Sequence, residues 1–241
     1  MTPHVAFHAP GFPTTMWSVV VNAHAVDESV ALQALERMAR AYWQPLYVFL
    51  RQRGSPHDEA SDAVQGFFEH LLRREVLQHV TRRETRFRTF LLTCFTRWLS
   101  NQRRDAHALR RGGGAVMLPI HELPVEELPA DVLAEQLYDR KWARTLFDLA
   151  LRRLDEEIEA REERRDFFQE LRRRVCGPLS GSPQWDEVAG PFGMSIVAVR
   201  KAAHDMRLRF ATLLRHEVRR VVGSDADVDG ELRHLAALLA G

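Results

Sequence analysis

Long uninterrupted apolar runs are missing from this chain of 241 residues, although 45% of its residues are hydrophobic. No run approaches the ~20 apolar residues that a membrane-spanning helix requires. The N-terminus also lacks the basic segment followed by an apolar stretch that marks a secretory signal. We therefore expect a cytoplasmic protein without a membrane span.

Cysteine is scarce as well, since the chain contains only Cys94 and Cys176. They lie far apart and form no C-x-x-C pair, which excludes a disulfide framework and fits a reducing compartment. The eleven histidines show no ligand spacing with cysteines or paired carboxylates. The motifs G-x-x-x-x-G-K-[ST], G-x-S-x-G and H-E-x-x-H are absent. We expect no catalytic residue, no metal, no cofactor and no enzyme activity.

The formal net charge is only +1, so the total charge does not demand an anionic partner. The charges are nevertheless distributed unevenly. Nine arginines lie in residues 82–111, where the only acidic residues are Glu84 and Asp105. Residues 122–135 then hold five carboxylates and no lysine or arginine. This reversal of sign along the chain indicates a modular organisation.

Period-two runs bounded by hairpin turns are absent, whereas apolar residues recur at helical spacing from about Val30 almost to the end. The pattern predicts an all-α protein. The helices are expected near residues 30–52, 58–73, 87–108, 132–160, 162–175, 184–190, 196–222 and 228–239.

The strongest break between these helices is Gly112-Gly113-Gly114, which is followed by three prolines among acidic residues. Such a composition buries little apolar area and is typical of a flexible linker. We expect two helical domains joined by this linker, with a helix-turn-helix in the C-terminal one. The predicted boundaries are an N-terminal arm at 1–29, a first domain at 30–111, the linker at 112–131, a second domain at 132–222 and a C-terminal helical extension at 223–241.

The most informative segment is 184–210, which carries the pattern of a helix-turn-helix. Gly193 can adopt the positive φ of a tight turn, and Ser195 is a good N-cap for the helix that follows. The apolar stripes of the two helices are Trp185, Val188, Ala189 and Phe192, and then Val199, Ala203, Met206 and Phe210.

On the second helix of this segment, the side chains expected to face away from the core are Val197, Ala198, Arg200, Lys201 and His204. A recognition helix presents such a surface to the major groove of DNA. The alternative interpretation is an ordinary helical hairpin whose exposed basic face is only solvated.

Two helices of the first domain also combine an apolar stripe with a polar face. In 58–72 the polar face includes Asp62, Gln65 and Glu69, which can be solvated or available to a partner. In 87–104 aromatic residues alternate with arginines, a density that suits strand-separated nucleic acid. Aromatic residues at helical spacing are more often core, and we expect Phe87 and Trp98 to be buried together with Phe90.

These segments together resemble the extracytoplasmic-function sigma factors of bacterial RNA polymerase. Residues 58–68 (DEASDAVQGFF) resemble the polymerase-binding helix of sigma region two, and 87–104 resemble its promoter −10 segment. Residues 188–200 resemble region four, which reads the −35 element. Residues 14–20 and 229–235 resemble the two ends of a subgroup of these factors, so the resemblance spans roughly 14–235.

The resemblance implies a transcription initiation factor that binds core RNA polymerase, through the β′ clamp and the β flap, and promoter DNA. An anti-sigma factor or another regulator is a further candidate partner. The residues implied to bind core polymerase are Asp62, Gln65, Phe68 and Glu69. Those implied to bind the −10 element are Arg86, Arg88, Arg97, Asn101, Arg103 and Arg104, beside a loop at about 74–86 that would receive a flipped base. Those implied to bind the −35 element are Ser195, Ala198, Arg200, Lys201 and His204.

The chain departs from the sigma pattern at two places. Thr96-Arg97 and Asn101 stand where many members have Arg-Asn followed by Asp, so the preferred −10 sequence does not carry over. Asp205 stands where a basic residue is usual, and its carboxylate would repel phosphate. The alternative function is a free-standing helix-turn-helix regulator that binds duplex DNA without polymerase.

Overall fold

The computed structural model describes residues 28–72, 87–110, 132–176, 184–222 and 225–240, and every regular element in these ranges is an α-helix. The predicted all-α class is therefore confirmed for the described part of the chain. No helix in these ranges is both long and apolar enough to cross a membrane. The helices are α2 (Glu28–Gln52), α3 (His57–Leu72), α4 (Phe87–Arg110), α5 (Val132–Glu159), α6 (Arg165–Cys176), α7 (Trp185–Ala189), α8 (Ile196–Val221) and α9 (Asp225–Ala240).

Most helix ends fall within three residues of the predicted ones, because the breaks are encoded locally. Gly54 ends the turn after α2 with a φ of +84°, and Asp58 and Glu59 occupy the first turn of α3. Helix α6 begins three residues after its predicted start near residue 162. Arg164 adopts a left-handed φ of 57°, so the helical backbone of α6 begins only at Arg165.

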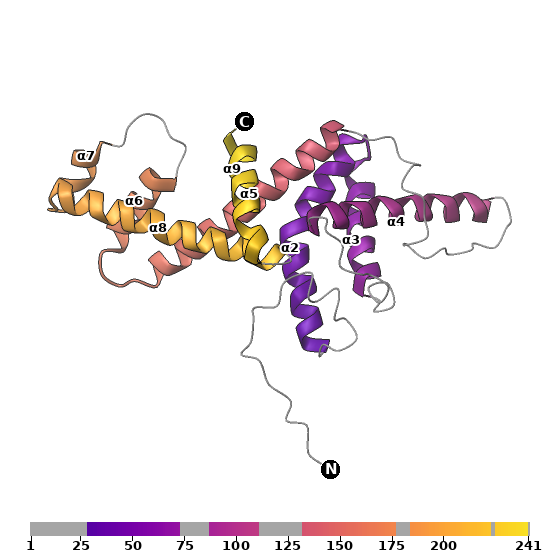
Figure 1. Ribbon diagram of the computed structural model, residues 1–241, viewed down its shortest axis with the longest axis horizontal. Helices are drawn as coiled ribbons and strands as arrows, with labels where there is room; N and C mark the ends of the chain where they lie inside the picture. The colour runs from indigo at the N-terminus through magenta and orange to yellow at the C-terminus, as the bar shows by residue number, and fades with distance from the viewer. Residues whose placement is uncertain (1–27, 73–86, 111–131, 177–183, 223–224, 241) are drawn as a thin grey trace, which may run out of the picture.

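The first hydrophobic core is built by helices from both ends of the chain. It combines the buried faces of α2, α3 and α4 with the first half of α5, the end of α8 and α9. Tyr42, Phe67, Phe95 and Trp142 are among its largest buried side chains. In Figure 1, α2 and α3 stand side by side, α4 projects away from them, and α9 lies where α5 and α8 approach α2.

The second core joins the later half of α5 to α6, α7 and α8 as far as Leu213. Leu154, Phe167, Leu171 and Val199 are buried at its centre. Helices α5 and α8 thus each contribute to both cores, and Figure 1 shows them running between the two groups of helices. The predicted linker at 112–131 lies outside the described residues, and the domain boundaries drawn around it remain predictions.

The aromatic residues of α4 form the wall that α3 packs against. Trp98 stacks with Phe95 at 6.3 Å between ring centroids and lies 5.8 Å from Phe67. A Cβ atom added at Gly66 would lie 3.3 Å from the Trp98 ring, so the absence of a side chain lets the two helices approach. Phe87 and Trp98 are 3% and 8% exposed, which confirms them as core, while Phe90 is half-buried.

A buried ion cluster ties α4, α5 and α9 together. The Arg88 guanidinium forms ion pairs with Glu231 of α9 and, at 3.0 Å, with Asp139 of α5. The Arg88 and Glu231 side chains are each only 5% exposed. The guanidinium also lies 4.9 Å from the centre of the Trp142 ring, a cation–π arrangement. Three helices distant in sequence therefore share one buried cation.

Two tyrosines line the same region and stay protonated. The hydroxyl of Tyr138 donates to the backbone oxygen of Arg88 at 3.0 Å, which adds a second link between α5 and the first turn of α4. Burial raises the pKa of Tyr138 well above its usual value, and burial likewise raises that of Tyr42. The phenols act as neutral hydrogen-bonding groups beside the cluster.

We predict that Arg88→Met lowers the free energy of unfolding by about 3–5 kcal/mol, because it leaves the buried Glu231 carboxylate without its cation. The double variant Arg88→Met/Glu231→Met should recover a large part of this loss, since the uncompensated charge is then gone. Urea unfolding followed by circular dichroism measures both values.

The control is Arg40→Met, which removes an exposed i,i+4 pair with Glu36 and should cost less than about 1 kcal/mol. Equal losses for Arg88→Met and Arg40→Met would contradict the central role of the cluster.

Candidate nucleic-acid interface

The segment predicted to form a helix-turn-helix contains α7, a short turn and α8. Gly193 takes the positive φ of 60° that the turn requires. The Ser195 side chain accepts a hydrogen bond from the backbone N–H of Ala198 at 3.2 Å and so caps α8. Both local predictions are confirmed. The turn itself is closed by the N–H of Met194, which donates to the Ala189 carbonyl at 3.0 Å.

Packing fixes α7 and α8 against α5 and α6. The predicted inward residues Val199, Ala203 and Met206 are buried, and Phe210 is half-buried. An ion-pair bridge adds to this packing, because Arg174 of α6 donates to Glu187 of α7 at 3.0 Å. The sequence analysis missed this bridge, since a pairing between helices leaves no periodic signal.

The outward face of α8 has the exposure predicted for it. Arg200, Lys201 and His204 are exposed, Ala198 is partly exposed, and Val197 is 77% exposed. Within the described residues, Arg200, Lys201 and His204 have no hydrogen-bond or ion-pair partner. Their polar groups are therefore available to an external partner over the first turns of α8.

Farther along α8 the basic residues are used inside the molecule. Arg209 forms an ion pair with Glu157, and Arg215 forms one with Asp229. The pairing with Arg209 lowers the pKa of Glu157, so this carboxylate stays charged. The unpaired positive charge of α8 is thus concentrated near its N-terminal end, although Asp205 is exposed there as well.

The second predicted surface is the polar face of α3. Asp62, Gln65 and Glu69 are exposed, and the Gln65 side-chain amide donates to Glu69 at 2.9 Å. Phe68 is half-buried and packs against the buried ring of Phe67, with 5.9 Å between centroids. The structure brings the four predicted residues together on one helix.

The third predicted surface, on α4, is only partly present. Arg103 and Arg104 are exposed, while Arg97 and Asn101 are partly buried. Arg104 donates to the Asn101 side-chain oxygen at 2.9 Å. Arg86 and the loop at 74–86 lie outside the described residues.

Arg88 needs a correction, because it does not lie on this surface. Its guanidinium is buried and forms ion pairs with Asp139 and Glu231. The prediction treated it as a DNA contact because residues 87–104 resemble the −10 segment of sigma region two. Its acidic partners lie 51 and 143 residues away along the chain, where no local pattern could reveal them.

Thr93, Thr96 and Ser100 of α4 carry hydroxyl groups that donate to the backbone of the same helix. Thr93 donates to the Thr89 carbonyl at 2.9 Å, and Ser100 donates to the Thr96 carbonyl at 3.1 Å. These hydroxyl protons satisfy the helix backbone, so an incoming ligand meets mainly the oxygen lone pairs.

Among the described residues, no three His, Cys, Asp or Glu side chains gather as metal ligands would. Comparison with protein-family models, curated proteins and solved structures finds no match to this chain. The geometry of the three surfaces is therefore the basis for the functional argument.

We predict that Ser195→Ala lowers the free energy of unfolding by about 1 kcal/mol, because the capping acceptor for the Ala198 N–H is lost. Ser195→Asp, which keeps an acceptor at the cap, should stay close to the parent protein. Thermal unfolding measures the difference. A destabilisation of the same size in both variants would exclude capping as the cause.

Proposed function

We propose that this protein is a transcription initiation factor of the sigma type, which binds core RNA polymerase, directs it to promoters and helps to open the −10 DNA. It acts through binding energy and carries out no chemistry of its own. The observation that supports this proposal most is the exposed and unpaired basic face at the start of α8, a helix that is capped by Ser195 and follows α7 and a tight turn.

The proposed role of α8 is to read the −35 duplex. A guanidinium or ammonium group on the first turns of such a helix can reach base edges, while other cations hold phosphates. Arg200, Lys201 and His204 have the exposure that this role needs, and Ser195 and Ala198 begin the same face. Asp205 limits the angle at which phosphate can approach.

The proposed role of α3 is to bind the β′ clamp of core polymerase through Asp62, Gln65, Phe68 and Glu69. This face is polar and open, and its helix is held by the buried Phe67 and the close approach to Trp98. With Arg88 removed, the residues proposed to hold the opened strand are Arg97, Asn101, Arg103 and Arg104 of α4, together with Arg86. The β flap and a regulator such as an anti-sigma factor remain further proposed partners.

The alternative function is a free-standing regulator that binds duplex DNA through the same α8. The face of α3 distinguishes the two, because a regulator of this kind has no use for a polymerase-binding helix. Co-purification with bacterial core RNA polymerase in one-to-one stoichiometry supports the proposal. Duplex DNA binding without any polymerase complex favours the alternative.

We predict that Asp62→Ala/Gln65→Ala weakens binding to core polymerase by about tenfold or more, since two contacts of the interface are lost. The matched control is Glu135→Ala/Gln136→Ala, which removes an exposed acid and an exposed amide from α5. Fluorescence anisotropy with labelled protein measures both affinities. An unchanged affinity in the α3 variant would remove α3 from the polymerase interface.

We predict that Arg200→Ala or Lys201→Ala costs about 1–3 kcal/mol of promoter binding and alters the preferred −35 sequence. Selection from a randomised −35 library, with polymerase present, measures the preference. The control is Arg233→Ala, an exposed arginine of α9. Equal weakening on every sequence would reduce the residue to a phosphate contact.

A further inference from the structure

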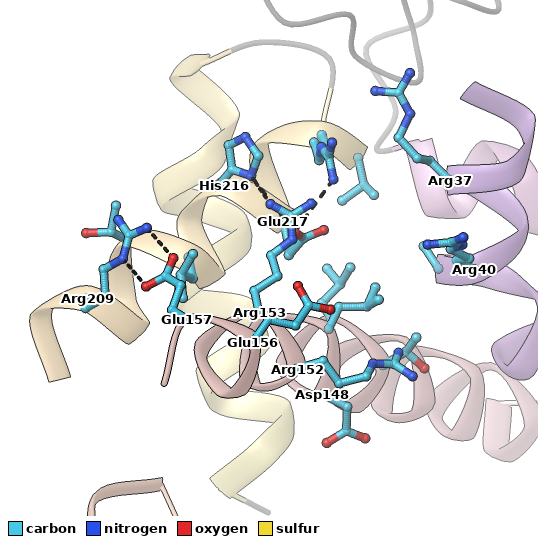
Figure 2. Close-up of a pocket in the computed structure, with 18 of the residues that line it drawn as sticks. Arg37, Arg40, Asp148, Arg152, Arg153, Glu156, Glu157, Arg209, His216 and Glu217 are labelled. Atoms are coloured by element: carbon cyan, nitrogen blue, oxygen red, sulfur yellow. Dashed lines mark hydrogen bonds and ion pairs between the residues drawn. The ribbon is translucent and has the colours of Figure 1, made fainter. Parts of the chain in front are cut away.

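A basic cleft lies between α2, α5 and α8, away from the exposed face at the start of α8. Its volume is about 1140 Å³, and Figure 2 shows side chains from all three helices around it. Its basic lining residues are Arg37, Arg40, Lys141, Arg152, Arg153, Arg209 and Arg220. Four carboxylates also line it, which leaves a formal excess of three positive charges when His216 is neutral.

Ion pairs do not neutralise this excess of positive charge. Arg153 and Arg220 share Glu217, and Arg209 pairs with Glu157. Within the described residues, Arg37, Lys141 and Arg152 form no ion pair. Among the carboxylates of the cleft only Glu156 is likewise without an ion-pair partner, because Asp148 pairs with Arg144.

Burial and the positive charge in the cleft lower the pKa of two of its groups, His216 and Arg220. Burial, followed by the charges of Arg220 and Arg153, lowers the pKa of His216. Burial, followed by the charges of Arg153 and Arg37, lowers the pKa of Arg220 against the opposing effect of Glu217. Arg153 donates to Nδ1 of His216 at 3.1 Å, which fits a neutral imidazole. An added anion would relieve this repulsion.

We propose that the cleft binds a short run of phosphate groups, held by Arg37 of α2 and by Lys141 and Arg152 of α5. Guanidinium groups offer paired N–H donors that match phosphate oxygens, and lysine adds a compact charge. No Phe, Tyr or Trp lies among the described lining residues, so a nucleobase has no aromatic ring to stack on. The site therefore recognises phosphate and not the base.

This site is distinct from the surfaces assigned above, and it does not depend on the proposed function. A bound oligophosphate spans α2 and α5, so it stabilises the arrangement in which these helices face one another. Ligands that bind only the folded arrangement stabilise it by RT ln(1 + c/Kd) at a free ligand concentration c, so the unfolding temperature rises with ligand concentration. The same phosphate chemistry has two sources, a free oligophosphate or the backbone of a nucleic acid.

The test is isothermal titration of the full chain with inorganic tripolyphosphate, ATP and a dT oligonucleotide. The cleft variant is Arg37→Gln/Arg152→Gln, and the matched control is Arg140→Gln/Arg233→Gln, two exposed arginines outside the cleft. We expect one tripolyphosphate per chain, bound at least about tenfold more weakly by the cleft variant. The control should change by less than about twofold, because its charges lie away from the bound anion.

Competition between tripolyphosphate and the oligonucleotide distinguishes the two sources of phosphate. Equal affinity for tripolyphosphate and ATP, with no displacement by the oligonucleotide, assigns the cleft to free oligophosphates. Displacement of bound tripolyphosphate by the oligonucleotide assigns it to a nucleic-acid backbone. The His216 ring signals should also titrate at higher pH when tripolyphosphate is bound. The absence of one-to-one binding, or equal weakening in cleft and control variants, would overturn the proposal.

Discussion

The arrangement of the helices depends on one buried cation, the guanidinium of Arg88. Desolvating a charged arginine is costly unless carboxylates and hydrogen-bond acceptors surround it. Here Glu231 and Asp139 supply the carboxylates, and Trp142 supplies a ring face. Because these groups belong to α4, α5 and α9, the first core is complete only when both ends of the chain are assembled. The second core is then positioned through α5 and α8, which run continuously between the two.

The same assembly creates the basic cleft and leaves the other surfaces open. Placing α2 opposite α5 and α8 brings Arg37 and Arg152 to one cavity, although neither helix is basic enough alone to indicate a site. The faces of α3 and of the first turns of α8 point away from these contacts and remain exposed. The ion cluster around Arg88 therefore joins α4, α5 and α9 without covering α3, the proposed polymerase-binding helix.

Features that depend on neighbouring residues, such as caps, turns and buried helix faces, could be predicted from the sequence. Contacts between residues far apart in the chain could not. Ser195 and Gly193 predicted the cap and the turn, and the apolar stripe from Val199 to Met206 predicted the buried side of α8. Helix existence followed from apolar periodicity in the same way. Periodicity carries no information about which charges will meet, so the partners of Arg88 could not be found. The start of α6 was predicted three residues too early because the left-handed backbone of Arg164 has no sequence signature.

The buried cluster also bears on how the proposed DNA surface of α4 works. An arginine–phosphate hydrogen bond contributes about 1.5–3 kcal/mol, whereas removing a partner from a buried ion pair costs about 3–5 kcal/mol. Moving the Arg88 side chain alone from the cluster to DNA would therefore be unfavourable, since the Glu231 carboxylate would stay buried without a cation. Moving Arg88 from the ion cluster to DNA becomes favourable only if α9 also leaves the core, because the Glu231 carboxylate is then hydrated. Under the proposed function, opened DNA is held by Arg103 and Arg104 while α9 stays docked.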